Sequence, residues 1–256
     1  MTEQVLRKNL FISGASSGLG AGMAREFAAR GCNLALCARR LDRLEELKAE
    51  LTAKYPQIKI TIRALDVMQY DEVFAAFRAF RDELGTLDRV IVNAGTGEGM
   101  PIGKGGFARN RAIVETNYLA AMAQCEAAME IFRAQGAGHL VVISSVSAFR
   151  GLRGGLTAYS SSKAGVAALA EGIRTDMLRK ATIKVTTIFP GYIRTEMNQD
   201  ADPQHTPFLI DGATGARLIA RAIEREPATA IVPWWPWAPV GYLIRRMPLR
   251  WIAKFF

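Results

Sequence analysis

Histidine and cysteine are both scarce in this chain of 256 residues. Two histidines, His139 and His205, are too few for a His-rich zinc site, and neither accompanies the serine motif of a hydrolase triad. Three cysteines, Cys32, Cys37 and Cys125, lie in apolar stretches without metal-ligand spacing, and an odd number cannot all pair. We therefore expect buried free thiols, a reducing compartment and no bound metal.

Apolar runs long enough to span a membrane are also missing. The longest uncharged candidate, residues 231–244, is interrupted by three prolines and a glycine, and no signal peptide is visible at the start of the chain. Half of the residues are hydrophobic and 22% are charged, which is typical of a globular domain. The sequence therefore predicts a soluble, cytoplasmic protein.

Acidic residues are absent after Glu226. The formal net charge is +9, and four basic residues of the C-terminal segment, Arg245, Arg246, Arg250 and Lys254, account for much of that excess. The remaining positive charge is dispersed, without a basic stripe or a recognised nucleic-acid module. We expect no nucleic-acid binding.

What the chain does contain is a tyrosine and a lysine, Tyr159 and Lys163, placed four positions apart. On a helix this spacing brings both side chains to one face, where the ammonium favours the phenolate. Lowering the pKa of a tyrosine from about 10 to neutrality takes roughly 4 kcal/mol of preferential stabilisation of the anion. The alternative, a packed phenol beside a solvated cation, is common, so the rest of the chain must decide.

A glycine-rich turn follows the first predicted strand, residues 9–13. Gly14, Gly18 and Gly20 precede a helical pattern with Met23 and Phe27 on one face. Strand, glycine turn and helix in this order are typical of the start of a nucleotide-binding unit, because the backbone can approach a pyrophosphate at the helix N-terminus. Taken alone, three glycines can also mean no more than a tight turn.

Two arginines, Arg39 and Arg40, follow the second predicted strand, residues 33–38. At this position a dinucleotide fold has a carboxylate for the ribose hydroxyls or an arginine for a ribose phosphate. The pair therefore favours NADP(H) over NAD(H), since guanidinium groups match phosphate oxygens. The alternative is two solvated arginines leading into a helix over 41–51, of which we expect Asp42 to be the cap.

Strand and helix patterns then alternate along the chain. Predicted strands cover 58–67, 87–92, 139–144, 183–189 and 229–232, and predicted helices include 109–132 and 212–225. This alternation predicts an α/β fold, a doubly wound Rossmann-type domain with a mainly parallel sheet of about seven strands and helices on both faces. Ligands of such sheets bind at the carboxyl ends of the strands, beside loops such as 95–107 and 200–211, which we expect to act as flaps.

Further polar candidates lie near these strand ends. Asn117 is a weak helix former inside a predicted helix, which suggests a buried amide with a local role. Ser144, Ser145 and Ser147 follow the strand 139–144, and a hydroxyl there can face the same cleft as Tyr159 and bind a substrate carbonyl. Serine at a strand end is also ordinary loop chemistry.

Taken together, these motifs resemble the short-chain dehydrogenases/reductases over residues 9–232. Ser13 stands where the family more often has threonine, and Val92 where it often has asparagine. The resemblance implies the catalytic residues Asn117, Ser145, Tyr159 and Lys163. It implies a cofactor site made of Gly14, Ser16, Ser17, Gly18, Leu19, Gly20, Arg39, Arg40, Asp66, Val67, Asn93, Ala94, Gly95, Tyr159, Lys163, Pro190, Gly191, Ile193 and Thr195.

The resemblance also implies the chemistry, which is interconversion of a carbonyl and an alcohol. Tyr159 exchanges the proton, Ser145 holds the substrate oxygen, Lys163 lowers the pKa of the phenol and binds the nicotinamide ribose, and Asn117 fixes a water that connects Lys163 to solvent. Ser144 and Ser147 remain alternatives to Ser145. We expect a hydrophobic small-molecule substrate and a homodimer or homotetramer; the rival hypothesis is a catalytically silent nucleotide-sensing or scaffold protein.

The resemblance does not explain the C-terminal segment. We divide the chain into a catalytic domain, residues 1–233, and an aromatic and basic tail, residues 234–256, which contains all four tryptophans. Ile244, Met247, Trp251 and Phe255 recur at helical spacing, interrupted by Pro248. The tail is expected either to pack in a subunit interface or over the substrate pocket, the preferred alternative, or to lie on an anionic membrane surface.

Overall fold

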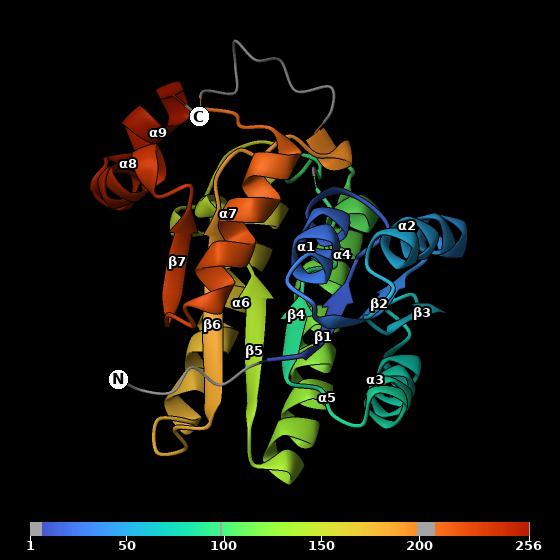
Figure 1. Ribbon diagram of the computed structural model, residues 1–256. Coiled ribbons are helices and arrows are strands. Elements are labelled where there is room, and N and C mark those ends of the chain that lie inside the picture. The colour runs from blue at the N-terminus through green and yellow to red at the C-terminus, as the bar shows by residue number, and fades with distance from the viewer. Residues whose placement is uncertain (1–6, 98, 199–207, 256) are drawn as a thin grey trace.

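A seven-stranded sheet forms the centre of the computed structural model, which describes residues 7–97, 99–198 and 208–255 (Figure 1). All of its neighbouring strands are parallel, in the order β3-β2-β1-β4-β5-β6-β7. The strands are β1 (Asn9–Ser13), β2 (Asn33–Ala38), β3 (Ile60–Ala64), β4 (Arg89–Val92), β5 (Gly138–Ile143), β6 (Ile183–Pro190) and β7 (Thr229–Val232). The predicted Rossmann-type sheet is confirmed.

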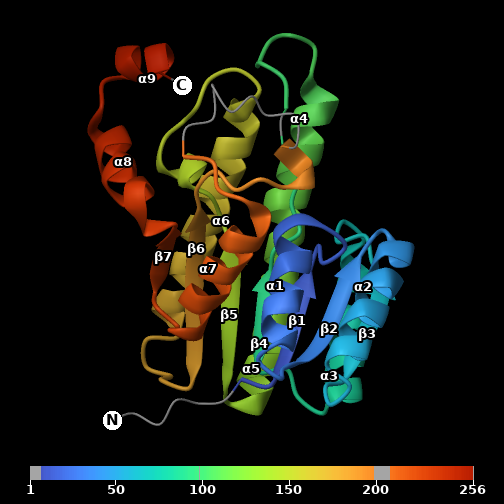
Figure 2. The ribbon, with the colours of Figure 1, turned by 45° about the horizontal axis from the view of Figure 1, so that its top comes forward.

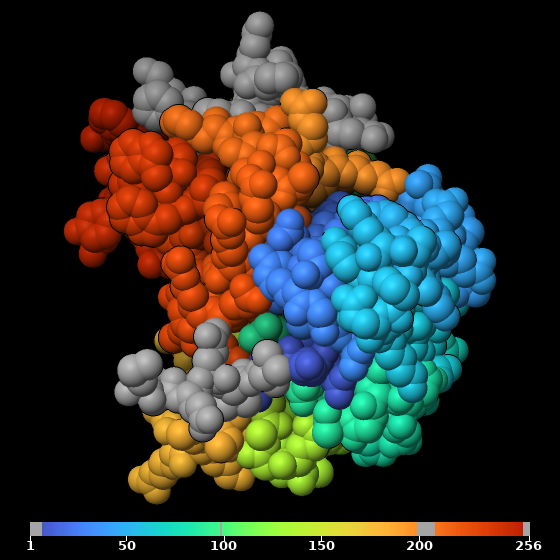
Figure 3. Space-filling view, in the orientation of Figure 1, coloured from blue at the N-terminus to red at the C-terminus, as the bar shows by residue number. Residues whose placement is uncertain are grey.

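Helices cover both faces of this sheet (Figure 2). One face carries α1 (Gly18–Ala28), α2 (Leu41–Lys54) and α7 (Gly212–Glu224), and the other carries α3 (Tyr70–Leu84), α5 (Ala120–Gln135) and α6 (Leu156–Asp176). Figure 3 shows α7 against α1 on the first face. A Cβ added to Gly22 of α1 would lie 2.6 Å from Cβ of Ala216 on α7, so the glycine permits this close approach.

Each strand contributes to two hydrophobic cores because successive side chains point to opposite faces. In β1, Leu10 and Ile12 pack under α1 and α7, whereas Phe11 packs on the other face. The Phe11 ring lies 4.2 Å from the ring of Phe77 on α3, centroid to centroid. Burial on both faces explains why these strands are apolar throughout rather than alternating.

Several element boundaries differ from the predictions. The third strand is shorter than expected, since its pairing with β2 ends at Ala64 and leaves Asp66 and Val67 in the following loop. The fourth strand begins at Arg89. Asp42 is not a cap, and this prediction was wrong: Arg40 occupies the cap position of α2, and Asp42 lies in the first turn, where a carboxylate still complements the helix dipole.

The long helix predicted over residues 109–132 is divided into three parts. It consists of α4 (Phe107–Val114), a π-helical turn (Glu115–Leu119) and α5. The π-helical turn contains Asn117, and turns of this kind are frequent at functional sites. The mid-helix amide is therefore placed by an irregularity in the backbone rather than by a regular helical face.

The tail forms two short helices, α8 (Trp234–Arg246) and α9 (Leu249–Phe255), separated at Pro248 as expected. Trp237 of α8 packs against Val146 and Phe189, and Ile244 and Ile252 pack against Leu152. The tail therefore covers the segment that joins β5 to α6.

Within the described ranges no helix is both long and apolar enough to cross a membrane, and no group of three metal-binding side chains is present. The predicted flap at 200–211 lies largely outside the described residues.

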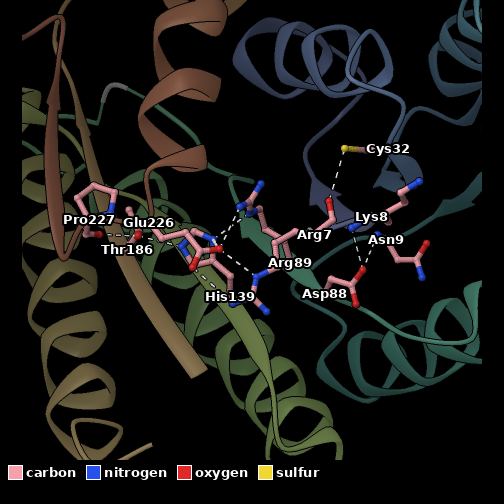
Figure 4. Close-up of polar contacts among 10 residues, drawn as sticks. All are labelled: Arg7, Lys8, Asn9, Cys32, Asp88, Arg89, His139, Thr186, Glu226 and Pro227. Carbon is pink, nitrogen blue, oxygen red and sulfur yellow. Dashed lines mark hydrogen bonds and ion pairs between the residues drawn. The ribbon is translucent and has the colours of Figure 1, made fainter. Parts of the chain in front are cut away.

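A buried polar cluster joins several elements at the amino end of the sheet (Figure 4). Arg89 Nε donates to His139 Nδ1 at 2.8 Å, so His139 carries its proton on Nε2, which lies 2.9 Å from Thr186 Oγ1. Glu226 forms ion pairs with Arg7 at 2.9 Å and with Arg89 at 3.2 Å. Burial holds the pKa of His139 well below its usual value, so the imidazole stays neutral and accepts from Arg89.

We expect Glu226→Gln to lower the free energy of unfolding by about 3 kcal/mol, because it leaves two buried guanidinium groups without their shared carboxylate. The matched control is Glu50→Gln, which breaks the exposed pair between Arg25 and Glu50 and should cost at most about 1 kcal/mol. Urea unfolding measures both. Equal losses in the two variants would contradict a stabilising role for the buried cluster.

Candidate active site

The turn between β1 and α1 brings free backbone N–H groups to the carboxyl end of the sheet. Gly14 has φ of +64° and Gly18 has φ of +52°, a region that disfavours other residues. A Cβ added to Gly20 would lie 2.2 Å from the carbonyl oxygen of Gly14. The first N–H groups of α1 have no partner within the helix, so this turn forms a cradle suited to phosphate.

Asn93, directly after β4, holds this turn in place. Its Nδ2 donates to the carbonyl oxygen of Ser13 at 2.9 Å and to that of Gly14 at 3.4 Å. In return, Ser13 Oγ accepts from the backbone N–H groups of Asn93 and Ala94 at 3.0 and 3.1 Å. Serine at position 13 thus supplies the hydroxyl that this arrangement requires.

Asn117 is buried and pairs with the backbone of Thr96. Its Oδ1 accepts from the Thr96 N–H at 2.8 Å, and its Nδ2 donates to the Thr96 carbonyl at 3.0 Å and to Ser162 Oγ at 3.2 Å. A Cβ on Gly95 would lie 3.1 Å from Asn117 Oδ1 and 3.4 Å from Lys163 Nζ. Asn93, Gly95, Asn117 and Lys163 therefore come together around the end of β4.

Lys163 and Tyr159 lie on the buried side of α6. Lys163 Nζ donates to the carbonyl oxygen of Ile143 at 3.0 Å and lies 5.9 Å from the centre of the Tyr159 ring. Burial lowers the pKa of Lys163 to about 8. It raises the pKa of Tyr159, with Ser145 acting against this shift and Tyr192 adding to it. The shift of the phenol is opposite to the expected one, because desolvation dominates and the ammonium bonds to Ile143 instead of the phenol.

The three neighbouring serines differ in what their hydroxyls contact. Ser144 Oγ donates to the carbonyl oxygen of Lys163 at 2.8 Å, so it fastens the end of β5 to α6. Ser145 Oγ accepts from the Ser147 N–H at 3.1 Å, donates to Ser147 Oγ at 3.2 Å and interacts with the phenol of Tyr159. These contacts favour Ser145 over Ser144 as the substrate-binding hydroxyl.

Arg40 links the glycine turn to a distant part of the chain. Its Nη2 donates to Ser17 Oγ at 2.8 Å, and the guanidinium forms two bonds to the Glu196 carboxylate, at 2.9 and 2.7 Å. These bonds lower the pKa of Glu196 to about 2. A cavity of about 520 Å³ borders Ser17, Arg40 and Glu196. Arg39, at the adjacent position, is exposed. Glu196 was not identified from the sequence, although it directly follows Thr195, a predicted cofactor residue.

Other predicted cofactor residues lie at the carboxyl ends of β3 and β6. Asp66 Oδ1 accepts from the Met68 N–H at 3.1 Å, and Val67 is buried. Thr195 faces the glycine turn, since a Cβ on Gly18 would lie 3.4 Å from its Cβ. Ile193 is buried and packs against Gly215 of α7, so its side chain points away from this edge.

Two aromatic residues beside the catalytic candidates were not identified from the sequence. Tyr192 and Trp237 form an edge-to-face pair with ring centres 4.8 Å apart, and a Cβ on Gly191 would lie 2.2 Å from Trp237 Nε1. Tyr192 also contributes to the raised pKa of Tyr159. Aromatic composition alone could not place Trp237, because that required knowing where α8 packs.

Known proteins are similar to this chain in sequence and in fold. The profile of the short chain dehydrogenase family matches residues 8–206. The chain is 50% identical to an uncharacterized oxidoreductase of Mycobacterium tuberculosis, over the full length of both. It is 31% identical to 11-beta-hydroxysteroid dehydrogenase 1A of Arabidopsis thaliana, with 94% of this chain and 72% of that protein covered. The chain belongs to the short-chain dehydrogenase/reductase family.

A solved structure adds the fold of a relative with a bound dinucleotide. This short-chain dehydrogenase/reductase superposes on an alcohol dehydrogenase from Thermococcus sibiricus complexed with 5-hydroxy-NADP, with a TM-score of 0.75 and 25% identity. The alignment covers 88% of this chain and 95% of the archaeal one. In this chain a Cβ at Gly20 would clash with the Gly14 carbonyl, and a Cβ at Gly95 would crowd Asn117 and Lys163, so both positions favour glycine.

We expect Gly20→Ala in this short-chain dehydrogenase/reductase to weaken dinucleotide binding at least 10-fold, because its Cβ must displace the Gly14 carbonyl and with it the turn. The matched control is Gly172→Ala on α6, where a Cβ meets no atom within 4 Å of the described chain and alanine should stabilise the helix by up to about 1 kcal/mol. Fluorescence titration and thermal unfolding measure the two effects. Unchanged dinucleotide affinity in Gly20→Ala would show that this turn is not the cradle.

Proposed function

We propose that this oxidoreductase interconverts a carbonyl and an alcohol on a hydrophobic small molecule, using NADP(H). The observation that carries the proposal is the meeting of Ser145, Tyr159, Lys163 and Asn117 at the carboxyl edge of the sheet, next to the glycine turn. A phenol, a hydroxyl and a buried ammonium in this arrangement suit proton transfer to an oxygen that gains negative charge.

The residues divide the reaction between them. A nicotinamide bound beside the glycine turn would supply hydride to the carbonyl carbon in the reducing direction. Tyr159 gives the phenolic proton to the carbonyl oxygen, and its raised pKa keeps the phenol protonated at neutral pH. Ser145 Oγ hydrogen-bonds the same oxygen. Lys163 returns a proton to the Tyr159 phenolate, because its pKa of about 8 lies close to neutral pH.

The preference for NADP(H) is supported by Arg40. Its guanidinium lies at the glycine turn, bonded to Ser17 Oγ, where a ribose phosphate would be matched by a planar pair of donors. The adjacent Arg39 adds positive charge. Glu196 acts against a phosphate at this position, since its carboxylate already occupies Arg40. We infer that phosphate binding displaces this carboxylate.

A hydrophobic substrate is supported by the aromatic side chains near Tyr159. Tyr192 and Trp237 pack together, and Phe149 and Phe189 form a second pair with centres 4.9 Å apart. The name of the Arabidopsis relative points to a hydroxysteroid, and a lipid-like or steroid-like ketone is our proposed substrate class. The division at residue 233, the homodimer or homotetramer and the cytoplasmic location remain predictions.

Tyr159→Phe tests the proposed reaction. We expect kcat for NADPH-dependent reduction of a panel of ketones to fall by at least about 100-fold, because no other group replaces the lost proton donor, while NADPH affinity changes little. Substrate-dependent NADPH oxidation measures kcat, and fluorescence titration measures binding. Undiminished turnover in the variant would refute the assignment. A wild-type protein that binds NADPH but turns over no ketone would support the silent nucleotide-binding alternative.

The serines provide a matched pair. Ser145→Ala should lower kcat by about 10- to 1,000-fold, since the developing oxyanion loses a donor. Ser144→Ala should lower the free energy of unfolding by about 1 kcal/mol, because it removes the bond to the Lys163 carbonyl, and should have the smaller effect on kcat. The reverse pattern would make Ser144 the substrate-binding serine.

Glu196→Gln tests the role of Arg40 in cofactor choice. We expect the dissociation constant of NADPH to fall about 5-fold and that of NADH to stay nearly constant, because only the phosphate competes with the carboxylate for the guanidinium. Arg40→Gln should have the opposite effect on NADPH. If Glu196→Gln improves NADH binding equally, the carboxylate acts on a part that both dinucleotides share.

A further inference from the structure

Large exposed apolar side chains are concentrated at one end of the molecule. Eleven of those described are at least half exposed. Ten of them belong to three segments near the carboxyl end of the sheet, which are the loop leading into α4 with the start of that helix, the segment after β6 and the tail. We call these ten the apolar rim: Ile102, Phe107, Met197, Phe208, Trp234, Trp235, Tyr242, Leu243, Leu249 and Trp251. The eleventh, Leu178, lies beyond the other end of α6. A patch of this size needs an explanation, whereas a single exposed leucine does not.

The three segments border one another near the start of α6. A Cβ on Gly97 would lie 2.9 Å from Met197 Cγ, and the Gly99 N–H donates to the Gly155 carbonyl at 2.9 Å. The Phe208 and Trp237 rings are 6.2 Å apart, which connects the segment after β6 to α8. Figure 2 shows α9 and the loop ahead of α4 at the same end of the molecule. The apolar rim therefore surrounds the end that contains Tyr159.

The helix α8 has apolar side chains on its outward face as well as on its inward face. Gly241 and Ile244 are buried, whereas Tyr242, Leu243 and Arg245 are exposed. A helix packed on a soluble body normally turns a polar, mixed-charge face to water. Figure 3 shows α8 and α9 standing out from the body at the upper left. The outward face of α8 combines aromatic and aliphatic groups with guanidinium groups.

All charged residues of α8 and α9 are basic. Arg245 stacks on Phe149 at 4.2 Å and Arg246 on Tyr242 at 3.9 Å, and Arg250 is exposed on α9. No acidic residue follows Glu226 in the sequence. Among the described residues, no acidic side chain forms an ion pair with these three arginines.

We propose that the apolar rim docks on the surface of an anionic lipid bilayer. Aromatic rings suit the interfacial layer of a bilayer, and Arg245, Arg246 and Arg250 lie where they can bind lipid phosphates. A second copy of the chain is a poorer occupant, because a two-fold interface across α8 would bring the arginines of both copies together. In this orientation the carboxyl end of the sheet, beside which Tyr159 lies on α6, faces the bilayer. Delivery of a lipid-soluble ketone from the bilayer follows only if the proposed function holds.

Tryptophan fluorescence gives a direct test on the full-length protein, since all four tryptophans lie between positions 234 and 251. Trp234, Trp235 and Trp251 are exposed and Trp237 is buried. Vesicles of equimolar phosphatidylcholine and phosphatidylglycerol should shift the emission to shorter wavelength and carry the protein upward in a flotation gradient. Vesicles of phosphatidylcholine alone should do much less. The assay contains no cofactor or ketone, so its result is independent of the proposed reaction.

Three variants and one control locate the binding surface. Arg246→Gln with Arg250→Gln should weaken partition into anionic vesicles about 10- to 30-fold, by the loss of two charges near the surface. Leu243→Ser with Leu249→Ser, and Phe107→Ser in a separate segment, should each weaken it several-fold. Leu178→Ser, equally exposed at the far end, should not. Circular dichroism confirms that each variant is folded.

Several outcomes would overturn the proposal. Absence of flotation with anionic vesicles at low salt would do so, as would an equal loss of partition in Leu178→Ser. Unchanged partition of Phe107→Ser would show that the rim does not dock as one surface. Sedimentation velocity covers the remaining possibility: if the tail variants abolish self-association and the wild type ignores vesicles, the occupant is a second copy of the chain.

Discussion

The backbone of residues 93–96, directly after β4, holds both halves of the site together. On one side, the Asn93 amide and the Ser13 hydroxyl fix the glycine turn to the end of β4. On the other side, Thr96 pairs with the buried Asn117 amide, and Gly95 leaves room for Lys163 Nζ. Displacing this short segment would separate the proposed dinucleotide cradle from the proposed proton-transferring groups.

Desolvation is the main physical influence on those groups. It moves the pKa values of Tyr159 and Lys163 in opposite directions, because one becomes charged by losing a proton and the other by keeping it. The raised pKa keeps the phenol protonated, which is the form that can donate to a carbonyl oxygen in the proposed reaction. A pKa of about 8 still leaves Lys163 mostly protonated at neutral pH, so it can supply a proton.

The buried ion pairs that stabilise the fold lie at the opposite end of the sheet from the proposed site. The cluster of Arg7, Arg89, His139 and Glu226 lies at the amino end of the sheet, and the proposed site lies at the carboxyl end. A parallel sheet produces this division, because all strands begin at one edge and end at the other. The tail adds a third region, with one face packed over the β5–α6 segment and an outward face of aromatic and cationic side chains.

The sequence by itself determined the family, the alternation of strands and helices, and the positions of the glycine turn, Asn117, Tyr159 and Lys163, because these features depend on local order and spacing. Tertiary structure decided the rest. Ser144 bonds to the Lys163 carbonyl, whereas Ser145 contacts Ser147 and the phenol of Tyr159. Arg40 meets Glu196 across 156 positions, and Trp237 reaches Tyr192 only because α8 folds back from β7. Such contacts depend on the order of strands in the sheet, which periodicity cannot specify.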